Sequence, residues 1–128
     1  MSYGVTTKYE DCTMSFGDLR WQHRILLISI DDSKELKELK AYADYSASEF
    51  AERKLIVVGV NSQTVHLLNS SLQCHPSLGD SQSRLNTNKA VLIGLDGSTK
   101  QRYDVIDPMR IFSDIDAMPM RRKERNTY

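Results

Sequence analysis

The sequence lacks several features that would assign it to a protein class at once. No apolar run approaches the ~18 residues that a membrane span needs, and the opening M-S-Y-G-V-T-T-K-Y-E-D has no apolar segment typical of a secretion signal. An excess of either charge is also missing, since 17 basic side chains face 17 acidic ones. We therefore expect no membrane insertion and no surface tuned as a whole to nucleic acid. The sequence as given predicts a cytoplasmic protein, or an exported one if a signal peptide has been removed.

Length and composition predict one ordinary folded domain. The chain has 128 residues, of which 40% are apolar and 27% charged. This length buries enough surface to hold a core without disulfides or metals. We expect a single domain over residues 1–128, with 1–18 as an approach segment and 121–128 as a basic tail.

The first half predicts a strand, a helix and a parallel strand. Arg24–Ile30 is a continuous apolar run typical of a buried strand, and Leu55–Val60 is a second. Between them, apolar residues recur at threes and fours from Ser33 to Arg53, which predicts one long amphipathic helix. Asp32 and Glu35 have the spacing of a capping box at its start. Such a unit is right-handed almost by default.

The stretch from Asn61 to Asn88 is polar and less regular. Val65, Leu68 and Leu72 predict one face of a helix, and Ser77–Leu85 predicts a second, short helix.

The last third predicts a hairpin and a helix. Asp96-Gly97 separates two strand-like runs and favours a tight type I′ turn. Asp107-Pro108 supplies a cap and a first-turn proline for a final helix, which Pro119 is expected to end.

These elements predict an α/β domain with a βαβ unit, a ββα unit and a central mixed sheet flanked by helices, which is the thioredoxin layout. The expected core comprises strand residues covered by helix residues. The strand residues are Leu27, Ile28, Val57, Val58, Leu92 and Ile93, and the helix residues are Leu39, Phe50, Phe112 and Ile115.

Four segments carry a family resemblance: L-R-W-Q-H-R-I-L-L-I from Leu19, E-R-K-L-I-V-V from Glu52, L-I-G-L-D-G-S-T-K from Leu92, and I-F-S-D-I-D-A-M-P-M-R-R from Ile111. With them the chain resembles the P-DUDES domain, a thioredoxin-like unit of bacterial single-domain proteins and of vertebrate matrix proteins of the sushi-repeat and drs/equarin type. The resemblance implies a fold and a commonly exported setting, but no reaction. Its motif residues here are Asp116, Met118, Pro119, Met120, Arg121 and Arg122.

The usual place for chemistry in such a fold holds no thiol. Open α/β sheets bind ligands beyond the carboxyl ends of their parallel strands, and thioredoxins place a reactive Cys at the start of the first helix. Here that place reads Asp31, Asp32 and Ser33. Capping accounts for Asp32 but leaves Asp31 unexplained. We expect no catalytic residue there and treat the three residues as a candidate pocket.

Both cysteines lie elsewhere, 62 positions apart at Cys12 and Cys74. Two free thiols, a stabilising disulfide and a working redox pair all remain open. His75 adjoins Cys74, but a single adjacent pair lacks the doubled ligand spacing of a zinc site. We predict no metal and no cofactor.

The end of the chain combines two methionines with a basic cluster. Lys123 onward is expected to be solvated, and one short cluster without stacking aromatics does not indicate a nucleic-acid binder. Pro119 must redirect the chain, and a solvated tail has no use for Met118 and Met120. We predict that the methionines cover apolar surface at the sheet edge. Arg121 or Arg122 should pair with a domain carboxylate, Asp114 and Asp116 being nearest.

The sequence therefore predicts a non-catalytic binding or interaction module whose partner is a protein or a small ligand. The alternative is a peroxiredoxin-like or thiol-disulfide oxidoreductase that uses Cys12 and Cys74.

Overall fold

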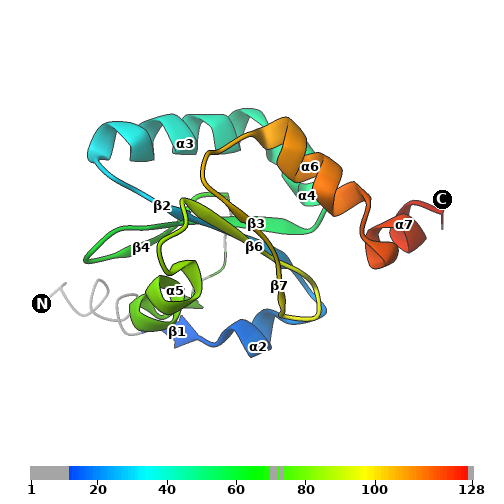
Figure 1. Cartoon of the computed structure of the whole chain (residues 1–128), viewed down its shortest axis with the longest axis horizontal. Coiled ribbons are helices and arrows are strands. Elements are labelled where there is room, and N and C mark those ends of the chain that lie inside the picture. Colours follow the sequence, from blue (N-terminus) through cyan, green and yellow to red (C-terminus); the bar gives the residue numbers. More distant parts are fainter. Residues whose placement is uncertain (1–11, 70–71, 73, 127–128) are drawn as a thin grey trace, which may run out of the picture.

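A computed structural model gives the fold (Figure 1) and describes residues 12–69, 72 and 74–126. The helices are α2 (Phe16–Leu19), α3 (Ser33–Tyr45), α4 (Ala47–Glu52), α5 (Leu78–Leu85), α6 (Pro108–Asp116) and α7 (Pro119–Asn126). The strands are β1 (Thr13–Met14), β2 (Arg24–Ser29), β3 (Leu55–Val60), β4 (Val65–Leu67), β5 (His75–Pro76), β6 (Ala90–Ile93) and β7 (Thr99–Tyr103).

The main sheet has five strands in the order β4-β3-β2-β6-β7. β2 and β3 run parallel, while the β2/β6, β3/β4 and β6/β7 pairs are antiparallel. The α/β class with a mixed sheet is thus confirmed, including the βαβ unit and the final ββα unit. Since β6 runs against β2, the β6–β7 turn lies at the end of the sheet where β2 begins.

Helices cover both faces of this sheet (Figure 1), with α3, α4 and α6 on one side and α2 and α5 on the other. Leu26, Ile28 and Val57 belong to one apolar cluster, together with Phe50 from α4 and Ile115 from α6. Alternate strand residues enter a second cluster with Phe16 from α2 and Leu85 from α5. This alternation is what a strand buried on both faces requires.

The predicted core is confirmed for all six strand residues, each no more than 3% exposed. Phe50 and Ile115 are also buried. Leu39 and Phe112 are only partly buried and pack against the edge of the cluster.

The prediction of a single helix from Ser33 to Arg53 is wrong, because this segment forms two helices. Ser46 takes φ −103° and ψ 21°, outside helical geometry, and separates α3 from α4. The Ser46 N–H still donates to the Tyr42 carbonyl at 2.9 Å. Since the apolar spacing continues across this local break, the pattern of apolar residues does not reveal it. Serine has little preference for a helix interior.

The predicted helical face of Val65, Leu68 and Leu72 is also wrong. Residues 65–67 form β4, which pairs with β3. The Asn61 side chain accepts hydrogen bonds from the Gln63 and Thr64 N–H groups at 2.8 and 2.7 Å. This turn reverses the chain and sets β4 beside β3. The short helix that follows is confirmed as α5, capped by Ser77.

The hairpin between β6 and β7 is confirmed, but its turn is not type I′. Gly97 has φ 85°, whereas Asp96 is not among the described residues with positive φ. The Gly97 N–H donates to the Gly94 carbonyl at 3.0 Å. A turn closed in this way and followed by a left-handed glycine is the longer hairpin loop, which accommodates an extra residue.

The last described residues form the helix α7, and the predicted solvation from Lys123 onward holds for Lys123 and Arg125, which are exposed, whereas Glu124 is partly buried. Asp107 caps α6 as expected, with Pro108 in its first turn. α6 ends at Asp116, and Pro119 begins α7 instead of ending a helix. Proline suits a first helical position because its missing N–H would have no partner there.

The described helices include none with the length and apolar character that a membrane crossing requires.

Candidate functional site

The predicted pocket at Asp31, Asp32 and Ser33 is a solvated helix start. All three residues are exposed. The Asp32 side chain accepts a hydrogen bond from the Glu35 N–H at 2.8 Å and so caps α3. The Glu35 carboxylate accepts in turn from the Asp31 N–H at 2.8 Å, one residue earlier than a capping box would place it. A hollow at this end of the sheet is lined by Ser29, Ile30, Val60, Asn61, Ser62, Gln82, Leu85 and Asn86, so the three predicted residues are not in its wall.

Lys89 holds the charges at this end together. Its Nζ lies 2.6 Å from Glu35 and 3.5 Å from Asp31, and it donates to the Ser29 carbonyl at 2.6 Å. The Asp31 carboxylate is therefore one weak partner of a lysine that has two better acceptors.

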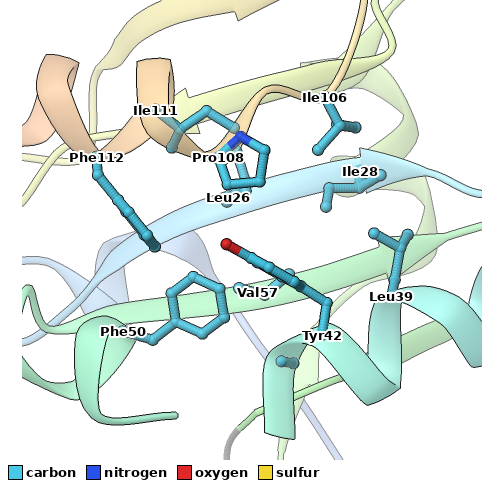
Figure 2. A pocket seen from close by; sticks show the side chains of 11 residues that line it. Leu26, Ile28, Leu39, Tyr42, Phe50, Val57, Ile106, Pro108, Ile111 and Phe112 are labelled. Atoms are coloured by element: carbon cyan, nitrogen blue, oxygen red, sulfur yellow. The ribbon is translucent and has the colours of Figure 1, made fainter. Parts of the chain in front are cut away.

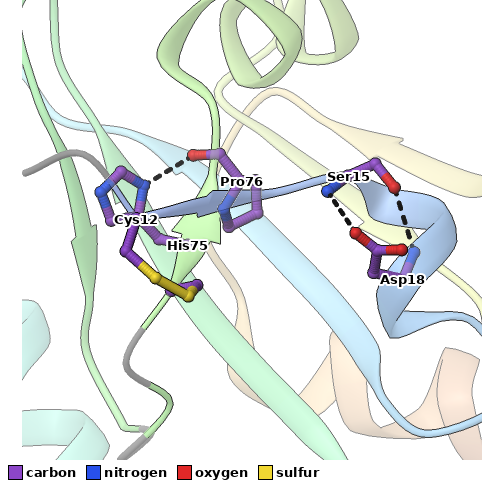
Figure 3. Close-up of a disulfide and its surroundings, with 6 residues drawn as sticks. Cys12, Ser15, Asp18, His75 and Pro76 are labelled. Atoms are coloured by element: carbon purple, nitrogen blue, oxygen red, sulfur yellow. Dashed lines mark hydrogen bonds between the residues drawn. A yellow bond between two sulfur atoms is a disulfide. The ribbon is translucent and has the colours of Figure 1, made fainter. Parts of the chain in front are cut away.

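Cys12 and Cys74 form a disulfide (Figure 3), with their Cα atoms 4.7 Å apart. The interpretation as two free thiols is therefore wrong. β1 and β5 pair beside the bridge, and the His75 N–H donates to the Cys12 carbonyl at 3.3 Å. The bond joins the start of the described chain to the segment before α5.

The three histidines lie in separate surroundings. His66 hydrogen-bonds Thr64, and His75 hydrogen-bonds the Pro76 carbonyl, both at 2.8 Å. Partial burial and the charge of Lys54 lower the pKa of His23. Within the described parts of the chain, no three His, Cys, Asp or Glu side chains are grouped to hold a metal ion.

An apolar gap lies between α3, α4 and α6 (Figure 2) and has a volume of about 30 Å³. Leu39 and Tyr42 reach it from α3, Phe50 from α4, and Ile111 and Phe112 from α6. A space this small with apolar walls stays dry and admits no cofactor. It is a packing gap in the core.

Charged residues are buried at the opposite end of the sheet, where β2 begins. Arg24, the first residue of β2, is 0% exposed. Its Nη1 donates to the Arg53 carbonyl at 2.8 Å and lies 3.3 Å from the Glu124 carboxylate. Its Nε is buried and has no hydrogen-bond partner among the described residues.

Two further arginines complete this group around Asp116. Arg53 contacts both oxygens of Asp116, at 3.2 and 3.0 Å, and the Arg121 Nε contacts the same carboxylate at 3.1 Å. Arg121 also donates to the Glu52 carbonyl at 3.1 Å and pairs with the Glu52 carboxylate. Partial burial opposes ionisation of Asp116, but the hydrogen bonds and charges of Arg53 and Arg121 outweigh it and lower its pKa. We call this group the arginine network; its members are Arg24, Glu52, Arg53, Asp116, Arg121 and Glu124.

The predicted fold-back of the end of the chain is confirmed through Arg121, which is 3% exposed and paired with Asp116. Arg122 is exposed, and Asp114 instead accepts a hydrogen bond from the Tyr103 hydroxyl at 2.7 Å. The prediction for the methionines holds only in part. Met118 packs against the core, whereas Met120 is 42% exposed.

A cleft of about 120 Å³ opens beside the arginine network. We call it the amino-end cleft, since it lies where β2 begins. Its wall is formed by Arg24, Leu95, Asp96, Lys100, Met118, Pro119 and Met120. Three of the four segments that carry the family resemblance, far apart in sequence, meet in this wall.

The polar rim of the cleft is held by the hairpin turn. Lys100 lies 3.0 Å from Asp96, which also accepts from the Ser98 N–H at 3.0 Å. The hydrogen bond from the Ser98 N–H is the main cause, and the hydrogen bond from Lys100 the next, of a pKa of Asp96 lowered to about 2. The Asp96 carboxylate therefore stays charged. Gly94 leaves room for the Lys100 side chain, because a Cβ there would meet Lys100 Cε at 2.6 Å.

Trp21 adjoins the same hairpin in an unusual conformation. Its φ is 71°, which is strained for a bulky residue, and the residue is 58% exposed. The Trp21 N–H donates to the carbonyl of Leu95, a residue of the amino-end cleft, at 2.6 Å. Trp21 is the single tryptophan of the chain.

Reasoning from the sequence singled out the motif residues but not their neighbours Arg24, Asp96 and Lys100. One signal was present: Arg24 opens the apolar run R-I-L-L-I-S, and a charge at the start of a buried strand needs a partner. The identity of that partner depends on residues a hundred positions away, as the 3.3 Å contact with Glu124 shows.

The fold and this site define a small α/β domain with a preformed cleft at one end of its sheet. Residues 15–124 match the family described as a domain of unknown function (DUF4174). The chain belongs to this family. It matches no curated protein and no solved structure.

Proposed function

We propose that this protein is a non-catalytic binding module that uses the amino-end cleft. One observation carries the proposal: segments around Arg24, Leu95 and Met118–Met120 converge on a single cleft. The arginine network fixes one side of that cleft and the hairpin turn fixes the other. A cleft supported by packed elements is preorganised, and preorganisation lowers the cost of binding.

The position of the disulfide favours binding over thiol chemistry. A helix N-terminus activates a thiol by lowering its pKa. The N-terminus of α3 carries Asp32 and Ser33 and therefore has no thiol to activate. The only two cysteines of the chain are joined to each other beside β1 and β5. A disulfide also fits an exported setting, since such bonds persist in oxidising compartments.

We also propose that the family relationship extends to the P-DUDES domain and that the fold is thioredoxin-like. The order β3-β2-β6-β7, with one parallel pair followed by an antiparallel hairpin, supports this relationship. The four segments of the resemblance lie within the residues that match the family.

Two measurements on the full chain test the proposed function. Disulfide reductase and peroxidase assays with ordinary thiol donors should give no turnover, and NMR shifts from a fragment library should cluster at the amino-end cleft. Turnover that disappears in Cys12→Ser or Cys74→Ser would establish the oxidoreductase alternative instead. Fragment shifts that cluster elsewhere on the domain would contradict the role of the cleft.

A further inference from the structure

We infer that the outer edge of β7 binds an acidic protein segment, which joins the sheet as an additional extended strand. Two observations carry this: three arginines beside β7 that have no carboxylate partner among the described residues, and the open edge of β7 itself. Arg20, Arg84 and Arg102 are not in the wall of the amino-end cleft, so this surface goes beyond the proposed function.

The three arginines gather around the β6–β7 hairpin. Arg84 of α5 donates from its Nη1 to the Gly97 carbonyl at 3.0 Å and to the Thr99 hydroxyl at 3.3 Å. Arg102 of β7 donates to the Arg84 carbonyl at 3.2 Å. Arg20 follows α2 and adjoins the same glycine, since a Cβ on Gly97 would lie 3.6 Å from the Arg20 Cδ. We call these three side chains the hairpin arginines.

The charges of the hairpin arginines are not compensated within the described parts of the domain. Their side-chain hydrogen bonds go to neutral oxygens, and none of the three forms an ion pair there. Asp80 stands one turn before Arg84 in α5, but Arg84 turns to the hairpin instead. By contrast, Arg53 and Arg121 both pair with Asp116. Neighbouring like charges repel one another, and a bound carboxylate would offset that repulsion.

The backbone of β7 offers an open edge. β7 is the last strand in the order β4-β3-β2-β6-β7, and among the described strands it pairs with β6 alone. The Tyr103 carbonyl accepts from the Lys89 N–H at 2.9 Å, so the Tyr103 backbone faces β6. Because alternate residues of a strand face opposite neighbours, the N–H and carbonyl of Arg102 point outward. Residues 100–102 are all exposed, and an edge of this kind accepts another extended segment.

The charges on this edge select its partner. Basic side chains and bulges protect an edge strand from pairing with copies of itself, and β7 has both Arg102 and a shift in its register against β6. An acidic strand meets no such repulsion. Side chains at alternate positions of a strand point to one face, so carboxylates two residues apart would all face the hairpin arginines. Lys100 adds little because Asp96 holds it at 3.0 Å, and the exposed Asp104 limits the acidic stretch to the length of β7.

The test is a titration of the full-length protein with the peptide acetyl-Thr-Glu-Val-Glu-Val-Glu-Thr-amide, followed by ¹H–¹⁵N NMR. The peptide should shift the amides of residues 99–102 along one saturable curve and slow the hydrogen exchange of the Arg102 N–H, which gains an acceptor. The same peptide with Gln in place of each Glu should bind at least about tenfold more weakly. N-methylation of two adjacent central residues should weaken binding to a similar degree, because it removes backbone donors that strand addition requires.

Substitutions at the exposed hairpin arginines separate recognition of charge from an effect on folding. Arg20→Gln and Arg102→Gln should each weaken binding of the acidic peptide about threefold to fivefold. Arg102→Glu should weaken it further and should bind a peptide with Lys in place of each Glu more tightly than the wild type does. A merely structural effect on the hairpin would weaken the binding of both peptides. The matched control is Arg122→Gln, which alters an exposed arginine of α7 and should change nothing.

Several outcomes would overturn the inference. Equal binding of the Glu and Gln peptides would remove the role of charge, and unchanged affinity after N-methylation would remove strand addition. Tighter binding of a heparin hexasaccharide would assign the hairpin arginines to a sulfated polysaccharide, and dimerisation through β7 without peptide would assign the edge to a second copy. The absence of any saturable shift at residues 99–102 would also contradict it. The fragment screen at the amino-end cleft tests the proposed function separately from all of these results.

Discussion

The two ends of the central sheet hold their charges in different ways. Where β2 begins, the Arg24 and Arg121 side chains are 1% and 4% exposed and contact carboxylates and backbone carbonyls. Where β2 ends, the Asp31 side chain is 78% exposed and lies 3.5 Å from Lys89. Buried ion pairs are costly to leave unpaired, whereas exposed pairs contribute little. The beginning of β2 is therefore the end where charge is organised.

The difference between the two ends limits a general rule for ligand sites in α/β sheets. The rule places ligands beyond the carboxyl ends of parallel strands. In this mixed sheet only β2 and β3 are parallel, and the antiparallel β6–β7 hairpin turns at the other end. The turn between α6 and α7 lies there too, because Met118 and Pro119 share a cleft with Leu95. Two turns beside a buried arginine make the better site.

Removal of the Arg24 side chain should cause the largest loss of stability at either end of the sheet. Arg24→Ala leaves Glu124 and the Arg53 carbonyl without their partner and should reduce the free energy of unfolding by about 3 to 5 kcal/mol. Urea denaturation measures the loss. At the other end, Lys89→Ala should cost only about 1 kcal/mol. Equal losses in the two variants would mean that the two ends do not differ in the way we describe.

Phe112 tests how the helices support the arginine network. Its ring lies 4.4 Å from the Arg53 guanidinium carbon and 5.5 Å from the Phe50 ring. Because Phe112 is only partly buried, Phe112→Ala should cost about 2 to 3 kcal/mol, below the value for a fully buried ring. Met109→Ala, on the same helix at a position 79% exposed, is the control and should stay within about 0.5 kcal/mol. A loss of unfolding free energy in Phe112→Ala as small as in the control would mean that α6 does not support the arginine network.

Much of the fold could be predicted because local signals agreed with it. The apolar runs at Arg24–Ile30 and Leu55–Val60, the Asp107 cap and the Gly97 turn each depend on nearby residues. The predictions failed where a single residue decided the outcome. Ser46 breaks a helix without disturbing its apolar pattern, and Asn61 turns the chain into β4 through its own side chain.

The site could be predicted only in part. The pairing of Arg121 with Asp116 could be predicted because the two residues are only five positions apart in the sequence. The contact between Arg24 and Glu124 joins residues 100 positions apart, and no local pattern relates them. The amino-end cleft forms only when three segments distant in sequence meet. The sequence therefore could not predict it, and the general rule for α/β sheets placed the expected pocket at Asp31, Asp32 and Ser33 instead.

Asp116 should make the beginning of β2 sensitive to acid. Its folded-state pKa is lowered, so its stabilising effect is complete above the unfolded pKa of about 3.9 and is lost as pH falls through the folded value. Asp116→Asn should cost about 2 kcal/mol at neutral pH, from the loss of charged hydrogen bonds. The variant should also lose less stability than the wild type between pH about 4 and about 2. Parallel pH curves for the two proteins would show that another carboxylate dominates the acid response.

Asp31→Asn should have the smallest effect, because it alters only the exposed end of the comparison. Asp31 is a distant partner of Lys89, which keeps Glu35 at 2.6 Å and the Ser29 carbonyl at 2.6 Å. The free energy of unfolding should change by less than about 0.5 kcal/mol. Glu35→Gln is the matched control on the same lysine, and it should cost more because it also weakens the hydrogen bond to the Asp31 N–H at 2.8 Å. If Asp31→Asn instead cost as much stability as Glu35→Gln, Asp31 would be an equal partner of Lys89 and the two ends of the sheet would differ less than we describe.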